Sequence, residues 1–214
     1  RAPHIYMGFP KRFMPDRSMY GHQHNGVSDA VFMSSRDGLS FKRWTEALIR
    51  PGLQPERWEN RNNMSAWGIL ETKNDLPSGP KELSIFTTEG YYRGDGCRLR
   101  RFTLRADGFV AANAPLSGGE LLTRPITFEG NQLSLNAATS AAGAIRVELQ
   151  HSDGKAVKGF TLADCDEVYG DSLERPVTWK GSTDVSSLAG QVIRLRFTLS
   201  DADLFSLQFQ TQPA

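Results

Sequence analysis

The segment that begins at Glu89 holds the residue types that cleavage of a glycosidic bond would use. Glu89 follows an apolar run and is followed by Gly90, Tyr91, Tyr92 and Arg93. Cleavage needs two carboxyl groups that face each other across the bond, one of them protonated near neutral pH. Tyr91 or Tyr92 could stack on a sugar ring, and Arg93 could bind a hydroxyl or a carboxylate. Glu89 is therefore the first candidate for a catalytic carboxylate; the commoner alternative is a surface acid paired with Arg93.

Asp29 is the second candidate for a catalytic acid. It precedes the apolar run Ala30-Val31-Phe32, and a strand could present it to a central cavity. The alternative is an acid that caps a turn through local backbone hydrogen bonds, which is a frequent use of aspartate. Glu71, after Trp67-Gly68-Ile69-Leu70, is a weaker third choice.

Two long polar stretches, residues 10–26 and 50–65, carry the candidates for substrate binding. Loops of such length in a compact fold are commonly functional or disordered. Trp58 and Arg61 stand close to two asparagines, and amide and guanidinium groups beside an indole face suit both the hydroxyls and the ring carbons of a sugar. Trp67 is assigned to a core, and for Trp58 both core and binding roles stay open.

The first polar stretch also contains His22-Gln23-His24, a spacing that places two imidazoles on one side of an extended segment. His4 could complete a zinc set. A pair of loop histidines more often faces solvent or substrate, so we predict no metal site and no cofactor, and we keep His24 as a substrate-binding candidate.

The sequence predicts that the candidate residues are positioned by β-hairpins. Three Asp-Gly pairs, beginning at Asp37, Asp107 and Asp153, lie between runs of alternating apolar and polar residues, which is a strong hairpin signal. The first two have similar surroundings, so the first half predicts a small sheet used twice, as in propeller blades. We expect strands at residues 5–9, 29–34, 67–72, 83–87 and 97–104, and one helical turn at residues 55–59.

The pattern changes near residue 117. The following residues alternate strictly between apolar and polar side chains, for example from Ile145 to Leu149 and from Ile193 to Leu199. A sheet with one buried and one solvent-exposed face is typical of an antiparallel β-sandwich. We therefore predict an all-β protein with two domains, residues 1–117 and 118–214, the second with six to eight strands.

Several stretches resemble a known family. The segment from Trp179 to Gly190, followed by Val192 to Phe197 and Asp201 to Phe205, is similar to the C-terminal sandwich of bacterial glycoside hydrolase-like proteins whose catalytic domain is a five-bladed β-propeller, the clan that cleaves fructosides and arabinosides. Residues 3–10, 26–38 and 97–101 resemble the closing blades of that propeller.

The resemblance implies a partial β-propeller of about two blades, followed by a jelly-roll-like sandwich. It also implies hydrolysis of glycosidic bonds by paired carboxylates. The family's early acidic motifs do not occur in this sequence, so the resemblance implies a truncated form with an incomplete catalytic set. The alternative is a noncatalytic carbohydrate-binding or structural β module.

The charge composition argues against two classes of binding partner. Twenty-five basic and 24 acidic residues give a net charge of +1, which does not favour nucleic acid or an anionic membrane. No apolar run approaches the ~18 residues of a membrane span. We expect a carbohydrate partner, and self-association through uncovered blade edges. Cys97 and Cys165 fall in different predicted domains, so we expect buried thiols rather than a disulfide. We expect a secreted or periplasmic location, although the sequence shows no signal peptide.

Overall fold

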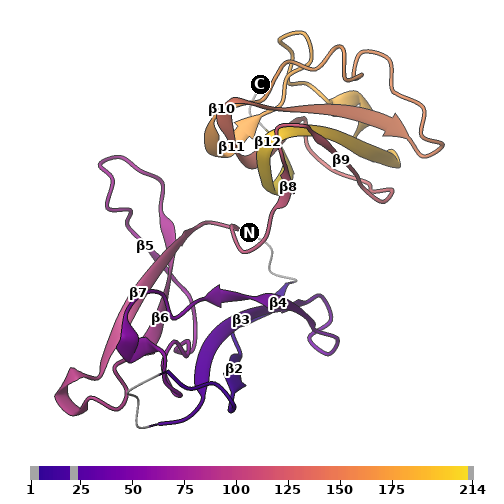
Figure 1. Ribbon diagram of the computed structural model, residues 1–214. Helices are drawn as coiled ribbons and strands as arrows, with labels where there is room; N and C mark the ends of the chain where they lie inside the picture. The colour runs from indigo at the N-terminus through magenta and orange to yellow at the C-terminus, as the bar shows by residue number, and fades with distance from the viewer. Residues whose placement is uncertain (1–4, 20–23, 212–214) are drawn as a thin grey trace. The chain divides into compact units, whose positions relative to one another are not determined.

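The protein is all-β. The computed structural model describes residues 5–19 and 24–211 of the chain, and it contains antiparallel sheets (Figure 1). The strands are β1 (Tyr6–Gly8), β2 (Lys11–Met14), β3 (Val27–Ser35), β4 (Lys42–Ile49), β5 (Leu70–Thr72), β6 (Glu82–Glu89), β7 (Arg98–Arg105), β8 (Ala112–Ala114), β9 (Gly119–Leu122), β10 (Gln132–His151), β11 (Asp171–Pro176) and β12 (Ile193–Gln210). Within the described ranges the helical elements are three 3-10 turns: η1 (Pro55–Arg57), η2 (Gly94–Gly96) and η3 (Ser186–Leu188). The helical turn predicted at Pro55 is therefore present as η1.

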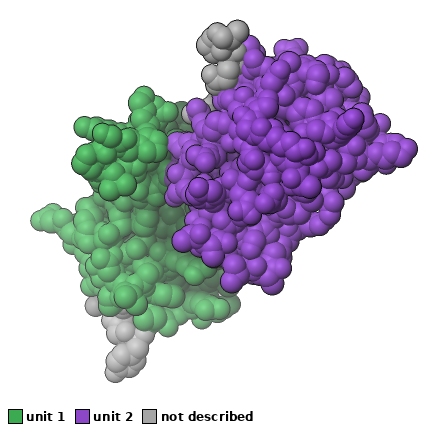
Figure 2. All heavy atoms as spheres, turned by 90° about the horizontal axis from the view of Figure 1, so that it is seen from above, with its two compact units in different colours: residues 1–104 green, residues 105–214 purple. Residues whose placement is uncertain are grey.

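The chain divides into two compact units between Leu104 and Arg105 (Figure 2). The sequence placed the change later, after residue 117. The difference arises because β8 and β9, on either side of residue 117, both pair with β12 and so belong to the second unit.

The first sheet of unit 1 is built around β3. Along one edge β3 pairs with β1 near its end and with β2 near its start, and along the other edge it pairs with β4. This strand is mostly buried along its length, as expected for a central strand with apolar side chains on both faces, Val27 and Val31 on one and Ala30 and Phe32 on the other.

The connection from β3 to β4 is one of the predicted Asp-Gly hairpins. The carboxylate of Asp37 accepts hydrogen bonds from the backbone N–H groups of Leu39 at 2.9 Å and Ser40 at 2.7 Å. Gly38 adopts a φ of 74°, in the left-handed region that glycine occupies without strain. The local sequence therefore closes this turn by itself, and the hairpin prediction is confirmed at this site.

The second sheet of unit 1 has the strand order β5-β6-β7 (Figure 1). Glu89 is the last residue of β6, and the turn from β6 to β7 contains Tyr91, Tyr92, Arg93 and η2. The candidate residues around Glu89 are thus placed on one strand end and the turn that follows it.

Unit 2 is organised by two long antiparallel strands, β10 and β12, which lie side by side (Figure 1). Their register shifts between Asn136 and Ala137 and again between Thr139 and Ala144, so each long strand bends while it stays paired. The pairing places β11 beside β10, and β8 and β9 beside β12. The sequence predicted six to eight shorter strands here. The alternation of apolar and polar residues could be recognised from the sequence. The irregularities in register, across which two successive alternating runs continue as one long strand, could not.

Three local predictions were wrong. Asp107-Gly108 forms a turn, but β8 after it pairs with β12 rather than with β7, so no hairpin forms. Trp67 is fully exposed and is not a core residue. Cys97 is exposed, whereas Cys165 is buried as expected, and both are free thiols.

The interiors of the two units differ in polarity. Among the described residues, the buried set of unit 2 is mostly apolar and forms one cluster that includes Leu135, Val147 and Phe197. In unit 1 the buried polar and charged residues outnumber the buried apolar ones. The buried polar residues are Ser28, Ser35, Arg57, Glu59, Asn62, Asn63, Ser84, Thr87 and Glu89. Buried polar groups need partners, so unit 1 is the unit in which to look for a site.

No helix in the described part of the chain has the length and apolar character needed to cross a bilayer.

Candidate functional site

Glu89 is the centre of a buried ion-pair network. Its side chain is 1% exposed. Nε of Arg98 donates a hydrogen bond to Oε2 of Glu89 at 2.9 Å, and Nε of Arg100 donates one to Oε1 at 2.8 Å. Nε of Arg57 lies 3.7 Å from the same Oε1. Arg98 and Arg100 are two residues apart on β7, so their side chains leave the strand on the same face and can meet one carboxylate.

This network sets the ionisation of Glu89. Burial by itself raises the pKa of Glu89, but the hydrogen bond from Arg100 and the positive charges of Arg100, Arg98 and Arg57 outweigh burial, and the pKa lies below its ordinary value. Glu89 is therefore a carboxylate at neutral pH. A general acid needs the opposite shift, so this environment suits a fixed negative charge better than a proton donor.

A second buried carboxylate belongs to Glu59, which follows η1. Its side chain is 4% exposed, and its Oε1 lies 3.6 Å from Nη2 of Arg93. Arg93 itself is half exposed. The expected pairing of Arg93 with Glu89 is thus replaced by pairing with Glu59, and Glu89 pairs with arginines of β7 and η1 instead.

Asn62 and Asn63 connect the pieces of this region. Both are fully buried. Nδ2 of Asn63 donates to the backbone carbonyls of Ser28 and Arg57, at 2.9 Å each, and its Oδ1 accepts from Nε of Arg57 at 2.8 Å. Oδ1 of Asn62 accepts from the backbone N–H of Tyr91 at 3.0 Å. The loop is therefore fixed to β3, to η1 and to the turn after β6.

The backbone of this loop is strained at two positions. Arg61 has a φ of 66° and Asn63 a φ of 59°, in the left-handed region that non-glycine side chains rarely adopt. Such positions cost about 1–3 kcal/mol each and persist where surrounding contacts determine them. The contacts here include the hydrogen bond from Oγ1 of Thr88 to the carbonyl of Arg61, at 2.6 Å. Strain of this kind clusters at functional sites.

The strained backbone presents Arg61 to a row of aromatic rings. Nη1 of Arg61 donates to the hydroxyl of Tyr91 at 2.9 Å, and its guanidinium carbon lies 5.1 Å from the centre of that ring. Tyr91 and Tyr92 meet edge to face with centroids 5.1 Å apart, and Tyr92 stacks on His24 at 3.8 Å. We call these four residues, Arg61, Tyr91, Tyr92 and His24, the aromatic face. The structure thus brings together four of the predicted binding residues from three separate segments.

Trp58 lies at the end of η1, half-buried. Its Nε1 donates to the backbone carbonyl of Gly52 at 2.7 Å. The indole N–H therefore stabilises the loop that contains η1.

Asp29 lies in the middle of β3 rather than at a turn. Both its carboxylate oxygens accept from Arg12, opposite it on β2, with Nε to Oδ1 at 3.0 Å. Its neighbour Ser28 donates to the carbonyl of Asn62. Successive residues on a strand face opposite sides, so Asp29 points away from the loop that supports the aromatic face. The structure does not bring Asp29 and Glu89 into one cluster.

The sequence missed the residues that hold the network together. Arg57, Arg98, Arg100 and Glu59 were not selected, although the alternate spacing of Arg98 and Arg100 after an acidic strand end was a usable signal. The catalytic roles proposed for Glu89 and Asp29 stay predictions, as do the binding roles of the aromatic face, Arg93 and Trp58.

A metal site is not indicated by the described residues, where no group of three or more His, Cys, Asp or Glu side chains could hold an ion. His4 and His22, two members of the histidine set considered from sequence, lie outside the described residues.

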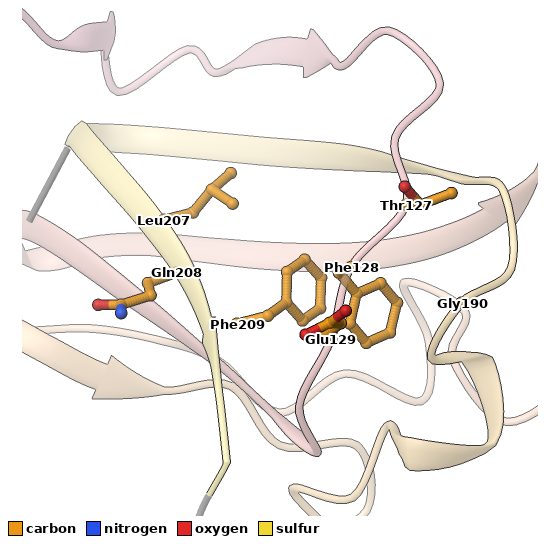
Figure 3. Close-up of a pocket in the computed structure, with 7 residues that line it drawn as sticks. All are labelled: Thr127, Phe128, Glu129, Gly190, Leu207, Gln208 and Phe209. Atoms are coloured by element: carbon orange, nitrogen blue, oxygen red, sulfur yellow. The ribbon is translucent and has the colours of Figure 1, made fainter. Parts of the chain in front are cut away.

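Unit 2 has an open groove lined by Thr127, Phe128, Glu129, Gly190 and residues 207–209 (Figure 3). The rings of Phe128 and Phe209 stack face to face with centroids 3.8 Å apart, and Phe128 is buried. Each ring is therefore occupied by the other and by the core of unit 2, which leaves little aromatic surface for a ligand. We give the groove no binding role.

Comparisons with known proteins add little. The sequence matches no protein-family model and no curated protein. A search of solved structures found the crystal structure of a glycoside hydrolase family 43 arabinoxylan arabinofuranohydrolase from Bacillus subtilis, in complex with cellotetraose. The identity is 14% and the TM-score 0.31, and the match covers 99% of this chain and 53% of that one. This chain thus spans about half the length of the glycoside hydrolase to which it is distantly similar.

Proposed function

We propose that this chain is a carbohydrate-binding protein of glycoside hydrolase-like ancestry, and that its sugar site is the aromatic face of unit 1. The observation that carries the proposal is the arrangement of Arg61 and Tyr91. A guanidinium held over an exposed tyrosine, by a backbone in a strained conformation, is a surface organised before any ligand arrives.

The chemistry of this face suits a sugar. Tyrosine rings offer an apolar surface for the C–H groups of a pyranose or furanose, and their hydroxyls accept or donate hydrogen bonds. The guanidinium of Arg61 and the exposed guanidinium of Arg93 offer planar sets of donors for ring hydroxyls. Because the buried asparagines fix the loop, little conformational entropy would be lost on binding.

Binding is favoured over catalysis because both candidate acids are occupied by arginine. Glu89 is held by Arg98 and Arg100, and Asp29 by Arg12. A carboxylate that is neutralised by neighbouring cations is a weak nucleophile and base, and the lowered pKa of Glu89 is the opposite of the shift that proton donation requires.

Hydrolysis of glycosidic bonds is the second candidate, and one observation favours it. Two carboxylates, Glu59 and Glu89, are buried in the same polar interior, and Asn62 connects Glu59 to the turn that begins after Glu89. A glycosidase needs two carboxyl groups, and these two adjoin the loop and the turn that carry the aromatic face.

We also propose, for the architecture, that unit 1 corresponds to about two blades of a partial β-propeller and that unit 2 is a jelly-roll-like sandwich. Support for the first comes from the large apolar side chains that unit 1 leaves exposed, Trp67, Leu70 and Leu99 among them, as expected for blade faces without neighbours. Support for the second comes from the continuous apolar cluster of unit 2.

The deciding experiment measures binding and turnover on one panel of substrates. Plant and marine oligosaccharides would be titrated by calorimetry against the wild type and Tyr91→Ala, and aryl glycosides would be assayed with the wild type and Glu89→Gln. Tyr169→Ala is the matched control, because Tyr169 is an exposed tyrosine of unit 2 that also lies under an arginine, Arg175.

We expect Tyr91→Ala to weaken sugar binding about tenfold or more, in line with the loss of one stacking ring, and Tyr169→Ala to leave it unchanged. Equal binding by both variants would remove the aromatic face from the proposal. If the wild type hydrolyses an aryl glycoside and a folded Glu89→Gln variant does not, hydrolysis would replace sugar binding as the proposed function.

A further inference from the structure

The aromatic face lies beside a region with an excess of positive charge. Five arginines lie in this region, and three glutamates are paired with four of them; one of these pairs joins Nη2 of Arg98 to Oε1 of Glu56 at 3.8 Å. Asp95, in η2, is a fourth acid of this region. The arginines are Arg57, Arg61, Arg93, Arg98 and Arg100, and the glutamates are Glu56, Glu59 and Glu89. Because the chain as a whole is nearly neutral, this excess is a local property of the site and not of the composition.

Two of the five arginines are committed to the interior. Arg57 is buried and donates to Asn63 and to the carbonyl of Arg50. Arg100 donates to Glu89 and to Oε1 of Gln54. Their role in the fold explains their presence without a ligand.

Arg98 also has partners within the chain, whereas the contacts that the structure describes for Arg61 and Arg93 leave donors free. Arg61 is exposed, and no carboxylate of the described residues pairs with it. Its side-chain hydrogen bond to the hydroxyl of Tyr91 uses one of five donors. Among the described residues, the side chain of Arg93 has one ion-pair contact, 3.6 Å from Glu59, and it is 52% exposed. Arg98 is equally exposed, but its three guanidinium nitrogens contact Glu89, the carbonyl of Gly96 and Glu56. Exposed guanidinium donors therefore remain at the side of the tyrosine rings.

The position of Arg61 matters most. Its left-handed backbone and its bond to Tyr91 hold the guanidinium over that ring and beside its hydroxyl, where a group carried by a sugar bound next to Tyr91 would reach it. A neutral hydroxyl would use one donor of a guanidinium, whereas a carboxylate or a sulfate accepts two in parallel and gains from the charge.

We infer that the site takes an anionic saccharide, with its carboxylate or sulfate bound by Arg61 and its ring against Tyr91. The inference rests on the proposed function and makes it more specific. A uronic acid and a sulfated sugar share this chemistry, and the experiment distinguishes them.

The test is a calorimetric titration of the full chain with three oligosaccharides of equal length: a uronic acid oligomer, a sulfated oligomer and a neutral oligomer. Each would be measured at low salt and at about 0.5 M salt, where the Debye length is only about 4 Å. The variants are Arg61→Gln and, as matched control, Arg175→Gln, since Arg175 lies over Tyr169 in unit 2 in a similar way. A sulfonated polymer without sugar rings serves as the polyanion control.

At low salt we expect one or both anionic oligomers to bind about tenfold more tightly than the neutral one, as one charge-assisted contact allows. Arg61→Gln should abolish that advantage, so that the anionic oligomers bind no more tightly than the neutral one, and Arg175→Gln should leave the advantage intact. Whichever of the two anionic oligomers binds more tightly identifies the anionic group, carboxylate or sulfate, that the site prefers.

Equal affinity for the neutral and anionic oligomers would overturn the inference and leave the proposed function standing. Equal affinity for the sulfonated polymer would also overturn it, because the surface would then recognise charge without a sugar. Absence of binding to every saccharide would overturn the proposed function together with the inference.

Discussion

Oε1 of Glu89 accepts a hydrogen bond from Nε of Arg100 at 2.8 Å, while only 1% of the Glu89 side chain reaches solvent. The two residues come from neighbouring strands, β6 and β7, so their pairing connects the end of one strand to the middle of the next. A buried carboxylate with cationic partners on the adjacent strand is a structural requirement of unit 1, whatever ligand the neighbouring surface binds.

Removal of this charge should destabilise the protein. In Glu89→Gln the arginines lose their counter-charge inside a polar interior, and breaking a buried pair in this way typically costs about 3 kcal/mol or more. We expect a loss of that order in the free energy of unfolding, measured by urea denaturation. Glu71→Gln is the control, since Glu71 pairs with Lys81 at an exposed site and should lose less than about 1 kcal/mol. Equal losses in both variants would contradict the network.

Acid should remove the same contribution. Burial raises the pKa of Glu89, but its arginine partners lower it further than burial raises it, so the folded pKa lies below that of the unfolded chain. The stabilisation is then complete above the ordinary glutamate pKa of about 4.3 and is lost as the pH falls through the lower folded value. Denaturation midpoints measured from pH 7 downward should fall more steeply in the wild type than in Glu89→Gln. Parallel curves for the two proteins would contradict this assignment.

The turn after β6 should tolerate no side chain at Gly90. A Cβ there would lie 2.8 Å from the backbone oxygen of Gly96, and the φ of Gly90 is +65°. Gly94, in the same turn, has a φ of +54° but nothing within 4 Å of a Cβ. We expect Gly90→Ala to lose about 1–2 kcal/mol more stability than Gly94→Ala, because both share the backbone strain and only the first adds a clash. Thermal unfolding of the two variants measures the difference, and similar losses would show that the turn can shift.

Unit 1 should self-associate through its exposed apolar residues. Trp67 is fully exposed, and Leu39, Leu53 and Leu76 are also largely exposed. Burial of one large aromatic side chain contributes about 2 kcal/mol, so Trp67→Ser should weaken association about tenfold or more in sedimentation velocity measurements over a range of concentrations. Leu116→Ser changes an exposed leucine of unit 2 and should have no such effect. A wild type that stays monomeric at every concentration would rule out this association.

The sequence predicted the elements that are determined locally. Asp37-Gly38 closes its own turn through the Asp37 carboxylate, so its hairpin could be identified from a few residues. The similar pair Asp107-Gly108 also turns the chain, but the partner of the next strand is β12, about ninety residues away in sequence, and no local signal identifies that partner.

The candidate site was predicted in part for the same reason. Glu89, Tyr91 and Tyr92 are neighbours in sequence, and Arg61 and His24 were selected by residue type. The partners that define the environment of Glu89 come from β7 and η1, and only the pairing of β6 with β7 brings Arg98 and Arg100 to the carboxylate. The sequence therefore indicated the surface of the site, whereas its electrostatics depend on tertiary structure.

The polar interior of unit 1 has a thermodynamic consequence. Exposure of apolar surface on unfolding raises the heat capacity, and exposure of polar surface lowers it. Since the residues buried in unit 1 are mainly polar and those in unit 2 mainly apolar, the two units should differ in heat-capacity increment although their lengths are similar. Unit 2 would then lose more of its stabilising free energy on cooling, and unit 1 would keep a flatter stability curve.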